Sequence, residues 1–169
     1  MVTGPQGEVR QRNDGTELVV LHRTFPDRVE DVWAALTESH RLARWIGSFT
    51  GEGGTGGTVE FTVTGEVDAG GEVAEPVTVS ILDCSPPTRL VVDFPADGGG
   101  SWHIAVTLAE HAGGTTLEFT QRLAAGVDAT DVEAGWRWYL DRLAASVAGT
   151  PMPNWDDYAP KPADNPGAP

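Results

Sequence analysis

Five consecutive segments between residues 57 and 123 alternate apolar with polar side chains. A period of two is typical of strands that have one buried and one solvated face. The inward residues that this alternation predicts are Val59, Phe61, Val63, Val77, Val79, Ile81, Leu90, Val92, Phe94, Trp102, Ile104, Val106, Leu108, Leu117, Phe119, Gln121 and Leu123. A turn signal, Gly113-Gly114, separates the last two segments. The pattern therefore predicts an antiparallel meander with one wet face.

A single long stretch with helical periodicity follows the predicted strands. Asp128 or Thr130 can cap its start, and it runs to about Ala148, where Gly149 and nearby prolines end it. Its apolar positions recur every three or four residues and are Val132, Trp136, Tyr139, Leu140, Leu143 and Val147. No other element offers enough apolar area to cover this stripe, so we expect the helix to lie on the sheet.

These two patterns together predict an α+β fold in which a curved antiparallel sheet wraps around a long C-terminal helix. A sheet that bends around one helix cannot close on it along its whole length. We therefore expect a cavity between the two layers.

A hairpin and two short helices are expected ahead of the meander. The hairpin covers residues 8–25 and turns at Asp14-Gly15, a pair that favours tight primed turns. After Pro26, a first helix would bury Val29, Val32, Trp33 and Leu36, which share one helical face. Ser39 can cap a second helix over residues 40–46, and Gly47 would end it in a left-handed conformation.

Charge and composition exclude several classes of partner. The formal net charge is −14 over 169 residues, so the field of the protein repels phosphate backbones and anionic lipid surfaces. Cys84 is the only cysteine, which excludes an internal disulfide and fits a reducing compartment. The N-terminus has no apolar run like that of a signal peptide, and no run of about 18 apolar residues occurs. We expect a cytoplasmic protein without nucleic-acid partners or membrane insertion.

Residue types that perform catalysis or bind metals form no recognisable constellation. The four histidines are His22, His40, His103 and His111, and none of their spacings converges on a metal. Cys84 has no adjacent base in its sequence context and is predicted to be a small buried thiol. We therefore expect no catalytic residue, no metal and no cofactor.

The stretch "GEGGTG", residues 51–56, fits the glycine pattern of dinucleotide-binding proteins. In those proteins a helix follows the glycines, and its N-terminus binds the pyrophosphate. Here a predicted strand follows. The stretch is therefore interpreted as a loop, which could gate the mouth of a cavity.

Rings and branched aliphatic side chains dominate the predicted inward positions. This composition suits a solid core and equally a pocket for a flat or lipid-like ligand. For the pocket, the expected ligand-binding residues are Trp45, Phe49, Phe61, Ile81, Phe94, Trp102, Ile104, Phe119, Val132, Trp136 and Leu140. Trp45 and Phe49 are expected near its entrance.

Several motifs, in order along the chain, carry a family resemblance. They are "LHRTFPDRVEDVWAALTESHRLARWIG", "SPPTRLVV", "GGTTLEFTQ" and "GWRWYLDRLAASVAG". Over residues 16–149 the chain resembles the bacterial Activator of Hsp90 ATPase homologue 1-like proteins of the START/Bet v 1-like (SRPBCC) superfamily. The resemblance implies a helix-grip fold that holds a hydrophobic small molecule between sheet and helix. The eukaryotic co-chaperones carry a further N-terminal Hsp90-binding domain, for which this chain has no room, so a chaperone partner is not expected.

Three functional hypotheses follow from the fold and the resemblance. The first is binding or carriage of a small hydrophobic ligand in the cavity. The second is an aromatase/cyclase-like enzyme, which needs an inward acid or base. The first candidate for that group is a pocket-facing carboxylate or His22, which is well placed if the strand turns Leu18, Val20 and His22 inward. The third is an Hsp90-type co-chaperone module that uses an outer surface.

Two residues of the long helix carry further expectations. Gly135 interrupts the helix ahead of three rings, and its missing Cβ would let a strand, a helix or a ligand approach the backbone. Trp138 points away from the Trp136 side by about 200°. We expect Trp138 to contact the C-terminal tail or another subunit, so a homodimer is an open alternative.

The chain is expected to divide into three parts. Residues 1–6 form a flexible start, residues 7–149 a single helix-grip domain, and residues 150–169 a proline-rich tail. Trp155 and Tyr158 lie within that tail. Docking of one of these rings on the domain and disorder of the tail are the two alternatives.

Overall fold

The computed structural model describes residues 7–63 and 75–158. The strands are β1 (Glu8–Gln11), β2 (Glu17–Phe25), β3 (Gly47–Thr50), β4 (Thr58–Val63), β5 (Val77–Ser85), β6 (Arg89–Pro95), β7 (Ser101–His111) and β8 (Gly114–Leu123). The helices are α1 (Val29–Thr37), α2 (Ser39–Leu42) and α3 (Ala129–Ala148), with short 3-10 turns η1 (Asp97–Gly99) and η2 (Trp155–Asp157). The expected flexible start, residues 1–6, lies outside the described residues.

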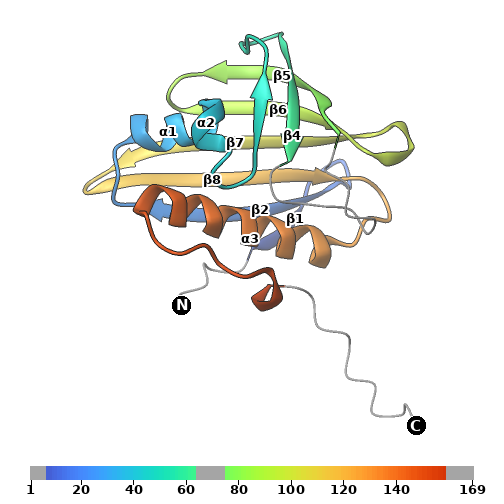
Figure 1. Ribbon diagram of the computed structural model, residues 1–169. Helices are drawn as coiled ribbons and strands as arrows, with labels where there is room; N and C mark the ends of the chain where they lie inside the picture. The colour runs from blue at the N-terminus through green and yellow to red at the C-terminus, as the bar shows by residue number, and fades with distance from the viewer. Residues whose placement is uncertain (1–6, 64–74, 159–169) are drawn as a thin grey trace, which may run out of the picture.

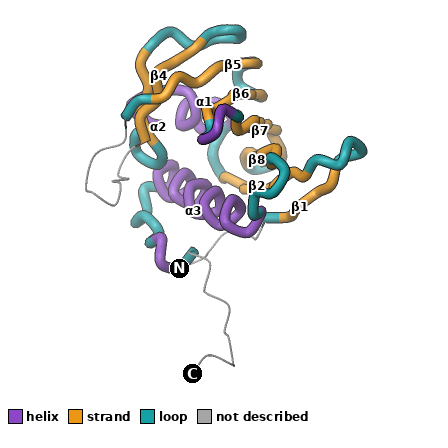
Figure 2. The backbone as a smooth tube through the Cα atoms, turned by 90° about the vertical axis from the view of Figure 1, so that its right-hand side faces the viewer, coloured by secondary structure: helices purple, strands orange, loops and turns teal. Residues whose placement is uncertain are grey.

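The strands form one eight-stranded antiparallel sheet in the order β1-β2-β8-β7-β6-β5-β4-β3. Figure 1 shows α3 lying across one face of this sheet, and Figure 2 shows the strands curling around the side on which α3, α1 and α2 lie. A curved antiparallel sheet that wraps a long C-terminal helix is the predicted fold, and the structure confirms it.

The central strands carry the core on the face that the alternation predicts. Val106 lies opposite Phe119 in the register of β7 and β8, and Leu108 lies opposite Leu117. These four side chains are all buried. Apolar side chains on adjacent strands therefore meet on the concave face, where burial of apolar area stabilises the sheet.

The β2 residues that point to the concave face are not those that the enzyme hypothesis needed. Leu21 pairs with Phe119 of β8, so Leu21 shares the concave face and His22 points the other way. His22 is exposed, and its Nε2 lies 2.9 Å from Oε2 of Glu118. The placement of His22 inside the sheet is therefore wrong, because the register with β8 sets the face of every β2 residue.

The junction after α1 also differs from the expectation. Ser39 is the first residue of α2 rather than its cap, and its hydroxyl donates to the Phe49 carbonyl and accepts from the Phe49 N–H. Gly47 begins β3, and its φ is not left-handed. A Cβ on Gly47 would lie 2.4 Å from the Thr62 carbonyl oxygen. This glycine is therefore needed for close strand packing and not to end a helix.

The long helix begins and ends where the sequence predicts. The Asp128 side chain accepts from the Thr130 N–H, and Gly149 follows the helix with a left-handed φ of 71°. No strand or neighbouring helix approaches the backbone at Gly135, because a Cβ there would meet nothing within 4 Å, so that part of the interpretation is wrong. The approach of a ligand to Gly135 stays a prediction. No helix in the described residues is long and apolar enough to cross a membrane.

Candidate functional site

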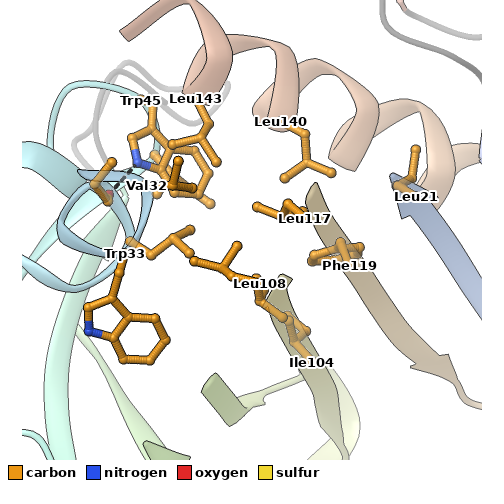
Figure 3. Close-up of a cluster of buried hydrophobic side chains, with 14 of the residues drawn as sticks. Leu21, Val32, Trp33, Trp45, Ile104, Leu108, Leu117, Phe119, Leu140 and Leu143 are labelled. Atoms are coloured by element: carbon orange, nitrogen blue, oxygen red, sulfur yellow. Dashed lines mark hydrogen bonds between the residues drawn. The ribbon is translucent and has the colours of Figure 1, made fainter. Parts of the chain in front are cut away.

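A cavity of about 280 Å³ lies on the concave face of the sheet. Its walls come from α3, from the α1–α2 segment and from strands β3 to β8. Figure 3 shows Leu140 pointing from α3 toward Phe119 and Ile104 on the strands opposite. The volume is close to the lower limit for pockets that bind small molecules, about 300 Å³.

Local sequence periodicity places the walls. Trp136 and Leu140 are four residues apart, so both project from the same face of α3. Alternate residues of the strands supply the opposite wall. Phe61 and Phe94 meet edge to face with ring centroids 5.3 Å apart, and Phe119 packs on Trp136 at 4.5 Å. Aromatic contacts of this kind add to the energy of area burial and fix the shape of the wall.

The α1–α2 segment and the glycine-rich stretch 51–56 also contribute to the cavity wall. Gly53 and Gly54 line the cavity, and a Cβ on Gly53 would lie 2.9 Å from Cδ1 of Ile81. The Thr55 hydroxyl accepts a hydrogen bond from the backbone N–H of Cys84 at 2.9 Å. The stretch connects β3 to β4 without a helix, so the basis for pyrophosphate binding is missing.

Nine of the eleven predicted ligand-binding residues lie together on the cavity wall. They are Trp45, Phe49, Phe61, Ile81, Phe94, Ile104, Phe119, Trp136 and Leu140. Trp102 and Val132 are not on this wall. Trp102 pairs with Phe94 at the start of β7 and is 48% exposed, and Val132 lies one helical turn before Trp136. The sequence pattern places both side chains toward the core, but neither side chain lines the cavity.

The sequence-based selection missed other wall residues. Val59, Val79, Leu90, Val92 and Val106 line the cavity. The alternation already places all five inward, but it does not show which of the inward residues line a cavity and which pack in the core. Thr37, Cys84, Gly53 and Gly54 also line the cavity and had no periodic signal that could have identified them.

The hydroxyl and indole groups of the described wall donate hydrogen bonds within the protein. The Thr37 hydroxyl donates to the Trp33 carbonyl at 2.8 Å. Nε1 of Trp45 donates to the Ala35 carbonyl at 2.9 Å. Nε1 of Trp136 donates to Oε1 of Gln121.

Cys84 is the one residue with a titratable side chain among the wall residues of the described part. Burial raises the pKa of the Cys84 thiol, and the neighbouring Asp83 carboxylate raises it further. The thiol is therefore protonated and uncharged at neutral pH. The wall formed by the described residues therefore carries no formal charge.

A titratable pair on β6 and β7 lies outside the described cavity wall. His103 lies on β7 with its Nδ1 2.8 Å from Oδ1 of Asp93, and neither residue lines the cavity. Within residues 7–63 and 75–158, no group of three or more His, Cys, Asp and Glu side chains could hold a metal ion.

The flank of α3 beside β2 carries a buried polar network. Nε of Arg23 donates to Oδ1 of Asp141 at 2.8 Å, and the Arg23 and Asp141 side chains are 5% and 10% exposed. The Tyr158 hydroxyl donates to the other carboxylate oxygen at 2.8 Å, and the Arg137 guanidinium lies 5.6 Å from the Tyr158 ring centroid. One carboxylate thus joins β2, α3 and the C-terminal segment.

The segment after α3 returns along the outer side of the helix, where Figure 1 shows it below α3. Nε1 of Trp138 donates to the Pro153 carbonyl at 3.1 Å, and the Trp138 and Trp155 rings meet at 5.2 Å. Tyr158 is 3% exposed. Of the two contacts expected for Trp138, the structure shows the one with the tail.

The chain is similar to one known protein family. The family model for Activator of Hsp90 ATPase homolog 1-like proteins matches residues 28–148. No curated protein matches the chain.

Several solved structures are similar to the chain in fold. CalU16 from Micromonospora echinospora is 24% identical, with a TM-score of 0.67 over 88% of this chain and 87% of CalU16. Protein BPP1335 from Bordetella parapertussis is 22% identical, with a TM-score of 0.72 over 92% and 87% of the two chains. DynU16, from the dynemicin biosynthetic locus, is 24% identical, with a TM-score of 0.65 over 81% of this chain and 49% of DynU16.

Proposed function

The chain belongs to the Activator of Hsp90 ATPase homolog 1-like family, and we propose that it binds or carries a small hydrophobic molecule in the cavity between its sheet and α3. Its fold is typical of ligand-binding and polyketide cyclase-like proteins. The family name describes chaperone regulation, but none of the described contacts favours that role over the cavity.

One observation carries this proposal: a cavity of about 280 Å³ has a wall made almost entirely of apolar side chains. Folding normally fills such a space, because interiors pack as densely as organic crystals. Wall atoms that face the cavity make fewer dispersion contacts than atoms of a packed core. A bound apolar molecule restores those contacts and removes its own surface from water, at about 25 cal/mol per Å² before ordering costs.

The cyclase-like alternative has less support. Such an enzyme needs an acid or base within hydrogen-bond reach of its substrate. His22 lies on the opposite face of the sheet, and the described wall holds neither a carboxylate nor an imidazole. The protonated thiol of Cys84 is a poor nucleophile and a weak hydrogen-bond donor.

The proposal includes the setting in which the protein works. We propose a cytoplasmic binding protein without nucleic-acid or membrane partners. The net charge of −14 and the single cysteine support this setting. Fractionation of source cells should recover the protein with the cytosol, and recovery with membranes would contradict this part of the proposal.

Native mass spectrometry of protein purified from its own host tests the binding function. Wild-type protein should carry a noncovalent small-molecule adduct that organic solvent releases. Val106→Phe places a ring in the cavity and should abolish the adduct, because Val106 lines the wall. Thr107→Phe adds the same ring on the opposite face of β7 and should retain it.

Two results would contradict the proposal. One is a bare wild-type mass together with no uptake of an apolar dye by the purified protein. The other is an adduct that Val106→Phe retains in full while the variant stays folded.

A further inference from the structure

The described wall of the cavity offers a ligand almost no side-chain partner for a hydrogen bond. The donors of Thr37, Trp45 and Trp136 already bind acceptors of the protein. A ligand acceptor could use any of these donors only by breaking an internal bond and leaving a protein acceptor unsatisfied, whereas the Thr37 hydroxyl oxygen can still accept one hydrogen bond from a ligand. Cys84 adds only a weak donor.

Trp136 is the clearest case. Its ring packs on Phe119 and its Nε1 donates to Gln121, which is 3% exposed. A ligand that competed for the indole N–H would leave the Gln121 carbonyl oxygen buried without this donor. The hydrogen bond therefore presents the apolar face of the ring to the cavity and hides its polar atom.

The wall also lacks a partner for a charged ligand. No Lys, Arg or His belongs to the described wall, and the Cys84 thiol is uncharged at neutral pH. The net charge of −14 adds a general repulsion of anions. An ionised group inside the cavity would lose its hydration without gaining an ion pair.

We propose that the natural ligand is an uncharged, hydrogen-bond-poor molecule whose buried part is recognised by shape and apolar contact alone. This inference rests on the proposed binding function and narrows the class of ligand. It excludes ligands whose buried part carries a carboxylate, sulfonate or phosphate. It also implies weak discrimination among neutral apolar molecules of similar size, because the side chains of the described wall offer few polar groups to orient them.

A matched pair of dyes tests this inference on the full chain. N-phenyl-1-naphthylamine is neutral, and 8-anilino-1-naphthalenesulfonate has the same ring system with one sulfonate. Fluorescence titration at neutral pH gives a Kd for each dye. We expect the sulfonate to bind at least about 30-fold more weakly, because the buried anion finds no partner. Only binding that Val106→Phe abolishes counts as cavity binding.

A positive charge added to the cavity wall gives a second test. Its readout is the ratio of the two Kd values, which a change in packing alone should not alter. Thr37 is the last residue of α1 and is half-buried at the cavity. Thr37→Lys should lower the ratio of the two Kd values by about tenfold, since its ammonium can pair with the sulfonate. Thr37→Gln, of similar length without the charge, should not lower the ratio.

The outcomes separate the two levels of the proposal. If neither dye binds in the cavity, the proposed binding function fails. If both dyes bind there with similar Kd values, the protein is a ligand-binding protein but the inference of an uncharged ligand is wrong. A ratio that falls equally in the Lys and Gln variants also overturns the inference, because the charge would then have no role.

Discussion

The two flanks of α3 are held by different kinds of contact. On the cavity flank, Trp136 and Leu140 face an open apolar space. On the β2 flank, Asp141 receives hydrogen bonds from Arg23 and Tyr158. The comparison shows how a helix can remain in place beside a hollow: directional polar contacts along one side hold it, so the other side does not need to pack fully.

The difference also separates stability from binding. A buried, hydrogen-bonded ion pair contributes little relative to an apolar replacement, but loss of one partner is strongly destabilising. An apolar wall behaves in the opposite way, because filling its cavity removes a binding site and need not destabilise the fold. Substitutions on the two flanks should therefore change different measurements.

The largest expected effect is on the polar flank. Asp141→Ala removes the carboxylate that pairs with Arg23 in a site that is nearly closed to solvent. The free energy of unfolding should fall by about 3–5 kcal/mol, measured by urea denaturation. Asp156→Ala, which removes an exposed carboxylate, is the control and should change it by less than about 0.5 kcal/mol. Equal effects of the two variants would show that the ion pair does not anchor α3.

The next effect belongs to the cavity flank. Val92→Phe adds a ring to the cavity wall and should weaken binding of N-phenyl-1-naphthylamine at least about tenfold, or about 1.4 kcal/mol. Its free energy of unfolding should change by less than about 1.5 kcal/mol. Leu82→Phe, at an exposed position of β5, should alter neither quantity. Unchanged dye binding by a folded Val92→Phe variant would move the binding site elsewhere.

A smaller effect tests the attachment of the C-terminal segment. Tyr158→Phe keeps the ring and removes the hydroxyl that donates to Asp141. A hydrogen bond to a charged acceptor contributes about 1.5–3 kcal/mol, so we expect a loss of about 1.5 kcal/mol in thermal or urea unfolding. The dye Kd of the folded variant should stay within about twofold. A stability equal to that of wild type would mean that the segment does not support this flank.

The smallest effect is expected at Trp102. The alternation predicts that the Trp102 side chain points inward, yet it is 48% exposed and does not line the cavity. Trp102→Ala should change the dye Kd by less than about twofold. A loss as large as that of Val92→Phe would place the ligand at this end of the sheet and would contradict the assignment of the wall.

Local periodicity explains why most of the cavity wall could be predicted from sequence. Phe61, Ile104 and Phe119 alternate with polar neighbours, and Leu140 follows Trp136 by one helical turn. Each pattern fixes which side of its element is buried. The pattern does not fix how far the opposite layer extends, which is why Trp102 was expected on the wall and lies beyond it.

Features that depend on pairing between distant segments could not be predicted in the same way. The face of His22 is set by the register of β2 with β8, about 100 residues later in the chain. The need for Gly47 comes from the Thr62 carbonyl on the neighbouring strand. The Arg23–Asp141–Tyr158 network joins three separate segments, and none of its residues has a distinguishing local pattern.

A crystal structure of the protein with N-phenyl-1-naphthylamine tests the central claim most directly. The account predicts one dye molecule between α3 and the sheet, in contact with Leu140, Phe61 and Ile104, while the Trp136 to Gln121 hydrogen bond and the Asp141 network remain intact. A cavity filled by the protein's own side chains, with the dye absent or bound on the outside, would contradict it.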